Sequence, residues 1–454
     1  MAQKIADRAP IERILNPFNR FFHLETSGGI LLLCSAIVAL LWANSPWSEA
    51  YHHLWEIVLA IEIGDFVLSY SLHHWINEGL MAIFFFVVGL EIKREVLIGE
   101  LSSPRKSALP IAGALGGMLV PAALYSVLNA GTVGAPGWGI PMATDIAFAI
   151  GVLAMLGSRI PLAIKIFLTA LAIVDDIGAV LVIAVFYTAE ISWYFLGLGA
   201  IFLAGLMSLN LVGTRRPLAY ALFGIGLWFA FLQSGVHATI AGVLMAMTIP
   251  ARSRISPRRM VIDGHQILDQ LEAVSGEESE RLRPNTEEQQ SALHALEKAA
   301  ERAETPMQRM ESGLHSWVSF VIVPLFALAN AGLVLDAGFL GAFSETTTTG
   351  IILGLVVGKP VGIALFSWIA VRLGLATLGR QVTWRHVWGA GMLGGIGFTM
   401  SLFIANLAFP AAEALELSKA GILSASLLAG TLGWFVLSGA TQQPQRHRDS
   451  EKSR

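Results

Sequence analysis

Three carboxylates and one ammonium group lie inside long apolar stretches of this sequence. Asp175 and Asp176 are adjacent in LTALAIVDDIGAVLVIAVF, which covers residues 168–186. Asp145 lies in GWGIPMATDIAFAIG, and Lys359 lies in GLVVGKPVGI. Charged groups deep in a bilayer are costly, and they normally face a bundle interior or a water-filled cavity. One lysine can neutralise one aspartate, so two carboxylates remain that require a proton or a metal cation.

The composition is that of a membrane protein with several spans. Of the 454 residues, 54% are hydrophobic and 14% are charged, whereas soluble domains carry about 25% charged residues. The net charge of −3 gives no indication of a nucleic-acid partner. The single cysteine, Cys34, excludes an intrachain disulfide.

Apolar runs of about 20 residues, the length that crosses a bilayer, mark the expected spans. Twelve are expected, near residues 26–44, 77–92, 107–128, 138–157, 162–188, 192–211, 217–233, 235–250, 314–335, 349–371, 386–408 and 416–438. Lys and Arg are concentrated before the first run and in every second loop after it. Because cytoplasmic loops carry this excess, both termini are expected in the cytoplasm.

The segments outside the runs complete the expected domain organisation. Residues 45–76 alternate partly between apolar and polar side chains, which predicts a periplasmic hairpin of strands or an interfacial segment. The expected parts are a cytoplasmic amphipathic arm (1–25), spans 1–8 (26–250), a charged helical insert on the cytoplasmic side (251–312), spans 9–12 (313–438) and a cytoplasmic tail (439–454).

Span 4 is expected to break just before Asp145. Gly139 and Pro141 precede it, and proline removes a backbone donor and disfavours helix in the residue before it. In a plain helix Asp145 would lie only about 10 Å from the outer surface, whereas Asp176 lies about 18–20 Å from either end of span 5. An extended GIPMAT, at about 3.3 Å per residue, would bring Asp145 to the depth of Asp176.

Span 11 carries a corresponding interruption. Its first half, in GAGMLGGIGFTMSLFIANLAF, holds five glycines that include Gly394, Gly395 and Gly397. Spans 3–5 and 10–12 enter the membrane from opposite sides, so the interrupted spans 4 and 11 correspond in opposite directions. This pattern is typical of an inverted-repeat transporter with its site near the midplane. Close helix packing is the alternative explanation of the glycines.

The two adjacent aspartates are expected to have separate partners. Neighbouring residues on a helix point about 100° apart, so Asp175 and Asp176 cannot act as one bidentate unit. One is expected to face Asp145 and the broken span, and the other is expected to face Lys359. The spacing alone leaves open which is which.

Seven stretches of the sequence match the motifs of a known family. They are NEGLMAIFFFVVGLEIKRE, PMATDIAFA, LAIVDDIGAVLVIA, SGVHATIAGV, VPLFALANAG, GLVVGKPVGI and GGIGFTMSLFIANLAF. In these motifs the sequence resembles the NhaA family of bacterial sodium/proton antiporters. The resemblance implies an all-α protein of twelve transmembrane helices with inverted repeats in the bacterial inner membrane. It implies Asp176 as the principal cation and proton carboxylate, Asp145 as its partner, Thr144 as a support, and Asp175 as the partner of Lys359.

The resemblance also implies that alkaline pH activates transport through residues at the inner mouth. The matching residues are Glu91, Lys93, Arg94, Glu95, Glu311 and His315, with His237 tied to the pH profile. Ser312 stands where the family pattern has a second histidine, and the insert before it is longer than in that pattern. These two departures from the family pattern lie among the residues matched to the pH response.

The expected activity is the electrogenic exchange of cytoplasmic Na+ or Li+ for external H+ by alternating access, for sodium and pH homeostasis. Removing a carboxylate from water favours its protonated form, so Asp145 and Asp176 are expected to hold either protons or a transported Na+. No cofactor is expected. The expected partners are membrane lipid and, by resemblance, a second copy of the chain in a homodimer.

Two alternatives remain at this point. One is a proton-coupled carrier of another monovalent cation such as K+. The other, a remote one, is an intramembrane aspartyl protease. Such a protease has a Gly-x-Gly-Asp stretch before its second aspartate, and AIVDD and MATD lack it. A lysine near the aspartates would also keep one of them ionised, so an enzyme is not expected.

Overall fold

The computed structural model describes residues 27–64, 66–188, 190–253, 257–275, 287–335, 339–379 and 381–440. The expected N-terminal arm (1–25) lies outside the described residues, as does the expected tail (439–454) except for its first two residues.

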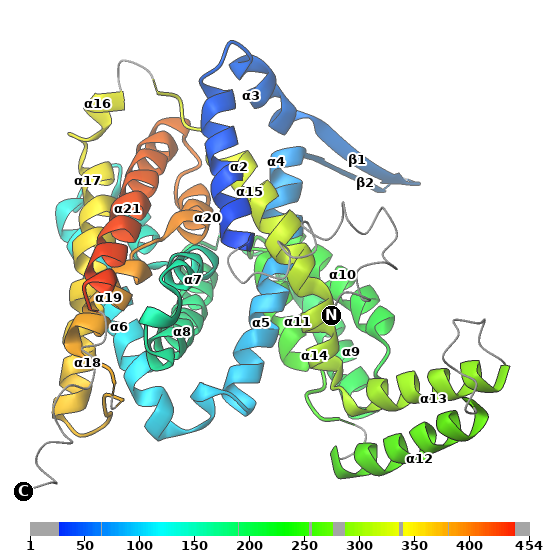
Figure 1. Ribbon diagram of the computed structural model, residues 1–454. Helices are drawn as coiled ribbons and strands as arrows, with labels where there is room; N and C mark the ends of the chain where they lie inside the picture. Colours follow the sequence, from blue (N-terminus) through cyan, green and yellow to red (C-terminus); the bar gives the residue numbers. More distant parts are fainter. Residues whose placement is uncertain are drawn as a thin grey trace, which may run out of the picture.

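Most helices run between two ends of the molecule (Figure 1). One end carries α3 (Ser48–Glu56) and a hairpin of β1 (Val58–Ile63) and β2 (Phe66–Ser71), and we call it the hairpin side. The strands pair antiparallel, with Val58 opposite Ser71. The other end carries α12 (Pro257–Ser275) and α13 (Glu287–Ala303), and we call it the insert side.

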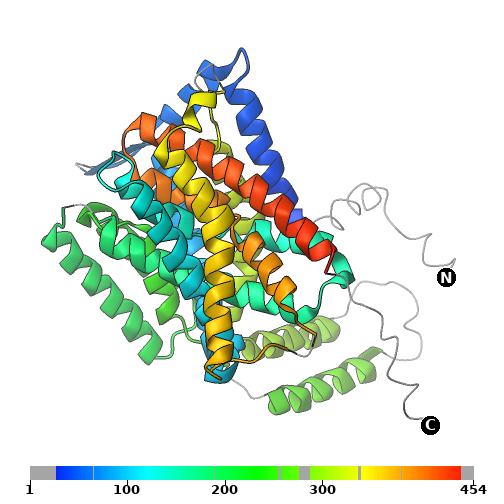
Figure 2. The ribbon, with the colours of Figure 1, turned by 90° about the vertical axis from the view of Figure 1, so that its left-hand side faces the viewer.

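One group of helices, which we call the repeat bundle, contains the two expected repeats. Its members contact one another more than they contact the rest of the chain. They are α6 (Pro104–Leu128), η4 (Ala135–Met142), α7 (Ile146–Met155), α8 (Leu162–Phe186), α17 (Thr346–Leu353), η7 (Gly354–Gly358), α18 (Lys359–Arg372), α19 (Trp384–Gly394), α20 (Phe398–Ala408) and α21 (Ala412–Ser438). Figure 2 shows this bundle with the yellow to amber helices α17 and α18 and the red helix α21 toward the viewer; α21 packs on α17.

Glycine permits the closest helix contact in the repeat bundle. A Cβ atom on Gly116 of α6 would lie 2.1 Å from the carbonyl oxygen of Gly362 in α18, and a Cβ on Gly362 would lie 2.0 Å from that of Gly116. Such contacts between backbones hold helices together in lipid, where burial of apolar surface contributes little. The two helices thereby place Lys359 in the interior.

The second group, which we call the scaffold bundle, contains the remaining crossing helices. They are α2 (Ser27–Ala43), α4 (Leu72–His74), η2 (Trp75–Leu80), α5 (Met81–Leu97), α9 (Trp193–Leu211), α10 (Pro217–Ser234), α11 (Thr239–Thr248), α14 (Pro306–Trp317), η6 (Val318–Ile322) and α15 (Val323–Asn330). It meets the repeat bundle where α2 packs on α7, α5 on α8 and α15 on α20. Short helices in connections are η3 (Glu100–Ser102), η5 (Gly157–Arg159) and α16 (Phe339–Ala342).

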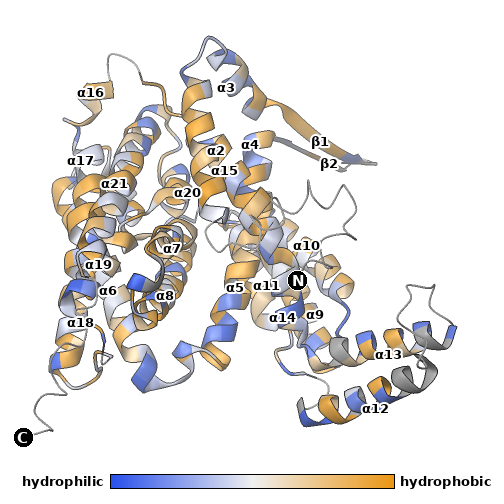
Figure 3. Cartoon of the chain, in the orientation of Figure 1, coloured by the Kyte–Doolittle hydropathy of each residue, from blue (hydrophilic) through white to orange (hydrophobic). Residues whose placement is uncertain are grey.

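The class of a multi-span helical membrane protein is confirmed, but a count of twelve spans is not. Nine helices of the described chain are long and apolar enough to cross a membrane, or eleven if each bent pair is one span. The predicted eighth span is only α11, whose ten residues cover about 15 Å of the roughly 30 Å hydrocarbon core. Hydrophobic residues are frequent along the helices of both bundles in the hydropathy colouring of Figure 3. Leu181, Val185 and Leu222 are more than half exposed, as lipid-facing residues are.

The charged insert is shorter than the sequence predicts. Its helices α12 and α13 pack against each other, but α14 begins at Pro306, within the predicted insert, and continues as one crossing to Asn330. Thr305 begins this crossing with a capping box, in which its hydroxyl accepts from the Gln308 N–H at 3.1 Å. The cap residue Thr305 therefore lies nine residues before residue 314, where the ninth apolar run begins and where hydropathy alone places the start of the span.

Candidate ion-binding site

Span 4 breaks immediately before Asp145, but not in the way that the sequence predicts. The segment Ala135–Met142 forms a 3-10 helix, and only residues 143–145 are extended before α7 begins at Ile146. The expectation of an extended GIPMAT is therefore wrong. A 3-10 helix rises about 2.0 Å per residue, so its eight residues cover about 16 Å. This length still places Asp145 near the middle of the span. Pro141 fits this form because 3-10 and proline φ values agree.

Span 11 breaks between α19 and α20, which are bent by 46° at residues 395–397. A Cβ atom on Gly395 would lie 2.3 Å from the carbonyl oxygen of Leu355, and one on Gly397 would lie 2.1 Å from the Ser401 hydroxyl. Gly394 is less confined, because the nearest atom to its added Cβ is Ile363 Cδ1 at 3.2 Å. The break therefore requires glycine at 395 for close packing against backbone.

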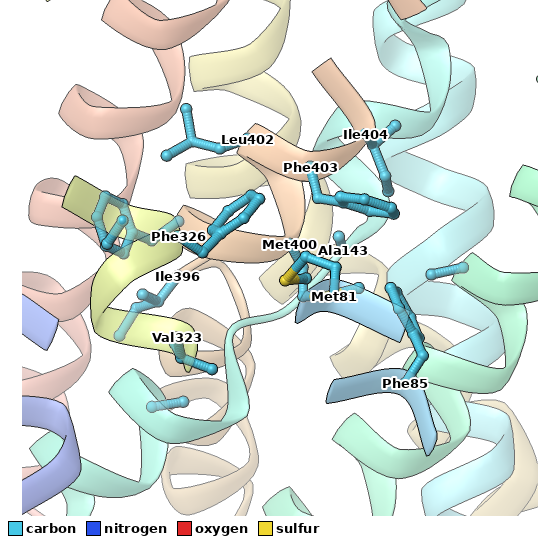
Figure 4. Close-up of a cluster of buried hydrophobic side chains, with 14 of the residues drawn as sticks. Met81, Phe85, Ala143, Val323, Phe326, Ile396, Met400, Leu402, Phe403 and Ile404 are labelled. Carbon is cyan, nitrogen blue, oxygen red and sulfur yellow. The ribbon is translucent and has the colours of Figure 1, made fainter. Parts of the chain in front are cut away.

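The two breaks cross and satisfy each other's freed polar groups. The Asp145 N–H donates to Ile396 O at 2.7 Å, and the Ser401 hydroxyl donates to Ile140 O at 2.8 Å. Unwound backbone is tolerated at membrane depth only when it is paired in this way or lines a cavity. Ala143 and Ile396, one from each break, belong to a single buried apolar cluster (Figure 4). The crossing is thus a compact, buried point that fixes the aspartates.

Asp145 is bound by donors from both broken spans. Its Oδ1 accepts from the Phe148 N–H at 3.0 Å, as the N-cap of α7. Its Oδ2 accepts from the Thr399 N–H at 3.1 Å and from the Thr399 hydroxyl at 2.5 Å. The N-termini of α7 and α20 therefore both point at this carboxylate, and helix N-termini favour negative charge. The carboxylate is held in place although Asp145 is buried.

Asp175 is the aspartate that contacts Lys359. The Lys359 ammonium donates to Asp175 Oδ2 and to Met142 O, and neither side chain is exposed. The Thr144 hydroxyl donates to the same Oδ2 at 2.6 Å and to Gly394 O at 2.8 Å. Thr144 therefore donates to Asp175 and not to the adjacent Asp145. The reason is that the extended backbone at 143–145 turns alternate side chains to opposite sides.

Asp176 differs from the other two carboxylates in having no donor. It is buried, and within the described chain no hydrogen bond or ion pair reaches its side chain. It lies within electrostatic reach of Asp175, Glu91, Asp145 and Lys359. A buried carboxylate without a partner is unfavourable unless it binds a proton or a cation.

A cation at Asp145 and Asp176 would need oxygen ligands of other kinds as well. In the described part of the chain no group of three or more His, Cys, Asp or Glu side chains is arranged to hold a metal ion. Hydroxyl, carbonyl and water oxygens suit a hard cation, and the crossing offers the Thr399 hydroxyl on Asp145. This donor set fits a weakly held ion and not a resident metal.

Most residues matched to the pH response meet on the insert side. Arg94 pairs with Glu311 and, at 3.3 Å, with Glu95, so α5 is joined to α14. Lys93 donates to Met247 O at 2.7 Å and to Ile249 O at 2.5 Å, which caps the C-terminal end of α11. His315 Nδ1 lies 3.9 Å from Glu91 Oε1.

His237 does not join that cluster, because it lies on the hairpin side between α10 and α11. Its Nε2–H donates to Tyr187 O at 2.7 Å, and its Nδ1 lies 3.6 Å from Glu78 Oε1. Sequence reasoning gave no role to Glu78 or to Thr399. Glu78 could have been found as a carboxylate near the start of a span, and Thr399 as a hydroxyl directly after the span 11 break.

The comparisons with known proteins agree with this architecture. The family model described as Na+/H+ antiporter 1 matches residues 19–437. A protein of Oleidesulfovibrio alaskensis named Na(+)/H(+) antiporter NhaA is 51% identical over 428 residues, which cover 94% of this chain and 95% of that protein. This chain is also similar to a protein of the same name from Koribacter versatilis, which is 49% identical over 94% of this chain and 92% of that protein. A protein of Syntrophotalea carbinolica named Na(+)/H(+) antiporter NhaA 2 is 51% identical over 94% of this chain and 97% of that protein. This chain therefore belongs to the Na+/H+ antiporter 1 family, whose members are multi-span membrane transporters and not enzymes.

Proposed function

We propose that this chain exchanges Na+ or Li+ for H+ at the crossing of the two broken spans, with Asp176 as the carboxylate for which cation and proton compete. The observation that carries this proposal is the contrast among the three aspartates. Asp145 has three donors and Asp175 has an ammonium group, whereas Asp176 is buried with none among the described residues.

Exchange follows if Asp145 and Asp176 bind either the cation or protons, but not both at once. When both are ionised, two negative charges at one buried point attract a monovalent cation. When protons neutralise them, that attraction is lost and the cation leaves. Moving one bundle against another around a fixed site then exposes the site to each side in turn. One state carries the cation and the other carries protons, which is an antiport cycle without a cofactor.

Lys359 has a structural role in this scheme. Its contacts with Asp175 and Met142 O tie α18 to both α8 and the span 4 break. Because it neutralises Asp175, the cation competes with protons mainly at the other two aspartates. If more than one proton is exchanged per cation, transport is electrogenic. Each charge moved is then worth about 2.3 kcal/mol per 100 mV of membrane potential.

We assign the insert side to the cytoplasm and the hairpin side to the periplasm of a bacterial inner membrane, with both termini cytoplasmic. The loops on the insert side carry the excess of Lys and Arg, including Lys93, Arg94, Arg105 and Lys106, which supports this orientation. The Arg94, Glu311, Glu91 and His315 contacts then lie at the cytoplasmic mouth, where an alkaline shift would act on them.

A homodimer through the hairpin is the assembly that we propose. Val58 and Val67 are 60% and 55% exposed on the two strands, and an unpaired sheet edge beside exposed apolar side chains favours pairing with another strand. Membrane lipid would cover the apolar helix faces that are exposed in the single chain.

Everted vesicles that contain the full chain test the proposed exchange. A pH gradient is established with respiration, and dequenching of acridine orange is measured after Na+, Li+ or K+ is added. Na+ and Li+ are expected to dissipate the gradient in the wild type and not in Asp176→Asn. A response to K+ alone would indicate the other cation carrier, and no response to any of the three would contradict antiport.

A further inference from the structure

The two bundles are joined by hydrogen bonds on the hairpin side of the aspartates. Asn406 Nδ2 of α20 donates to Asn330 Oδ1 of α15 at 3.0 Å. His237 donates to Tyr187 O at 2.7 Å, and Lys419 of α21 donates to Gly332 O at 3.4 Å. Asn406, Lys419 and Tyr187, the residue directly after α8, belong to the side of the repeat bundle. Their partners Asn330, Gly332 and His237 belong to the scaffold bundle or to the loop that follows α15. Motion between the bundles must therefore act on these contacts.

Asn330 is the centre of a buried amide cluster. Its Nδ2 donates to Asn77 Oδ1 of η2 at 3.0 Å and to Phe326 O at 2.9 Å, and His73 Nε2 lies 3.0 Å from its Oδ1. Asn330 and Asn77 are 1% and 9% exposed. Asn77 and His73 belong to the same bundle as Asn330. Asn406 is thus the member that comes from the other bundle.

The Asn406–Asn330 bond can break without leaving either amide unpaired. Asn406 Nδ2 also donates to Leu402 O of its own helix at 2.8 Å. Asn330 Oδ1 retains its hydrogen bond with His73 Nε2, and Asn330 Nδ2 retains its hydrogen bond to Asn77 Oδ1. An unpaired buried amide is what makes the loss of a buried hydrogen bond expensive, and here that cost is avoided. The bond is therefore suited to open and close repeatedly.

A layer of phenyl rings separates this cluster from the aspartates. Phe403 lies one turn before Asn406 on α20 and one turn after Thr399, so the three residues share one face of the helix. Its ring centroid is 5.4 Å from that of Phe85 in α5 and 6.2 Å from that of Phe326 in α15. All three rings are fully buried, and Figure 4 shows them among Met81, Met400 and their neighbours. These ring contacts join α20 to the scaffold helices α5 and α15 at a level between Asn406 and Thr399.

We propose that Phe403 and the Asn406–Asn330 hydrogen bond form the gate that closes the ion site toward the hairpin side. Phe403, held between two scaffold phenylalanines, is the barrier, and Asn406 is the latch that keeps it there. The proposal rests on the alternating access proposed above. The structure is then the state closed toward the hairpin side, and outward opening withdraws α20 from α15.

Cross-linking tests the latch in the full-length transporter. The single native cysteine is replaced (Cys34→Ser), and cysteines are introduced as Asn330→Cys with Asn406→Cys. Oxidation to a disulfide would hold α15 and α20 together. Na+/H+ exchange is expected to be lost on oxidation and to return on reduction. The reduced form of the same variant is the reference. If the reduced form does not exchange Na+ for H+, the proposed exchange fails; if the reduced and oxidised forms exchange equally well, only the proposed latch fails.

The matched control lies in the same cluster but within one bundle. Asn77→Cys with Asn330→Cys joins η2 to α15, both in the scaffold, so oxidation is expected to leave the exchange rate of that variant unchanged. An oxidised Asn330→Cys/Asn406→Cys protein that transports at its reduced rate would overturn the proposal. Equal loss of exchange in both oxidised pairs would also overturn it, because the cluster would then be a rigid structural unit.

A second measurement does not require transport. Ser401→Cys places a reporter on the ion-site side of Phe403, and a membrane-impermeant cationic methanethiosulfonate is applied from the hairpin side to a protein that lacks Cys34. Asn406→Leu is expected to raise the reaction rate about threefold to tenfold, the population change that loss of one hydrogen bond produces. Asn129→Leu, which removes a buried amide bonded only within the repeat bundle, is the control. An unchanged rate in Asn406→Leu, or an equal rise in Asn129→Leu, would contradict the latch.

Discussion

The ammonium group of Lys359 donates to two acceptors at once, Asp175 Oδ2 and the carbonyl oxygen of Met142. Met142 is the last residue of the 3-10 helix before the span 4 break, and Asp175 lies on α8. A single side chain of α18 therefore fixes the position of the break relative to the aspartate pair. The same ammonium group neutralises Asp175 and donates a hydrogen bond to the free carbonyl oxygen of Met142.

Removal of one member of this pair is expected to destabilise the protein more than removal of both. Lys359→Met leaves a buried carboxylate unpaired, and breaking a buried pair on one side costs about 3–5 kcal/mol. Asp175→Leu with Lys359→Met leaves no buried charge there and is expected to unfold at a higher temperature than Lys359→Met alone. Thermal unfolding in detergent measures this. A double variant less stable than the single variant would contradict the account of the pair.

Thr144→Ala is expected to lower stability by about 1–3 kcal/mol, because the Asp175 oxygen and Gly394 O lose a buried donor. Thr144→Ser retains the hydroxyl and is expected to restore most of the stability. The same unfolding assay applies. If Ser and Ala behave alike, the methyl group and not the hydroxyl is what the site requires.

Thr399→Val keeps the shape of the side chain and removes the hydroxyl that donates to Asp145 Oδ2. A donor to the ionised carboxylate favours that form, and a bond of this kind is worth about 1.5–3 kcal/mol. Protons are then expected to compete better with Na+, so the apparent KM for Na+ rises at neutral pH and approaches the wild-type value at alkaline pH. Acridine-orange dequenching across a pH series checks this. A KM that changes equally at every pH would show a purely structural effect.

Gly395→Ala and Gly394→Ala form a matched pair for the span 11 break. At 395 the added Cβ would lie 2.3 Å from a backbone oxygen, whereas at 394 the nearest atom is a side-chain methyl at 3.2 Å. Overpacking against atoms that cannot move costs about 1–3 kcal/mol, so Gly395→Ala is expected to express and transport poorly. Gly394→Ala is expected to remain close to the wild type in both. Equal effects at the two positions would argue against the crossing geometry.

The sequence predicted the location of the breaks better than their form. Pro141 and the glycines of span 11 mark where a helix cannot continue, because these are local properties of the backbone. The 3-10 helix before Asp145 was not predicted, since proline φ values suit both helical and extended backbone. Hydropathy also counted α11 as a full span, because it measures apolar length and is insensitive to where a helix ends.

The pairing of side chains was predictable only in part. Helix geometry showed that Asp175 and Asp176 need different partners, but their assignment depended on the family resemblance. The contacts of Thr399, of Glu78 and of the cluster formed by Asn77, Asn330 and Asn406 were not predicted. These side chains lie far apart in sequence, and a neutral amide in a span carries no charge that would mark it as unusual.

The role of Asp176 is tested most directly by calorimetry of Na+ binding to the purified full chain, with proton release measured in buffers of different ionisation enthalpy. The wild type is expected to bind Na+ and release protons as it does so. Asp176→Asn is expected to lose both, whereas Asp175→Asn still binds Na+. Binding of Na+ by Asp176→Asn with wild-type affinity and proton release would contradict the assignment of Asp176 as the carboxylate shared by cation and proton.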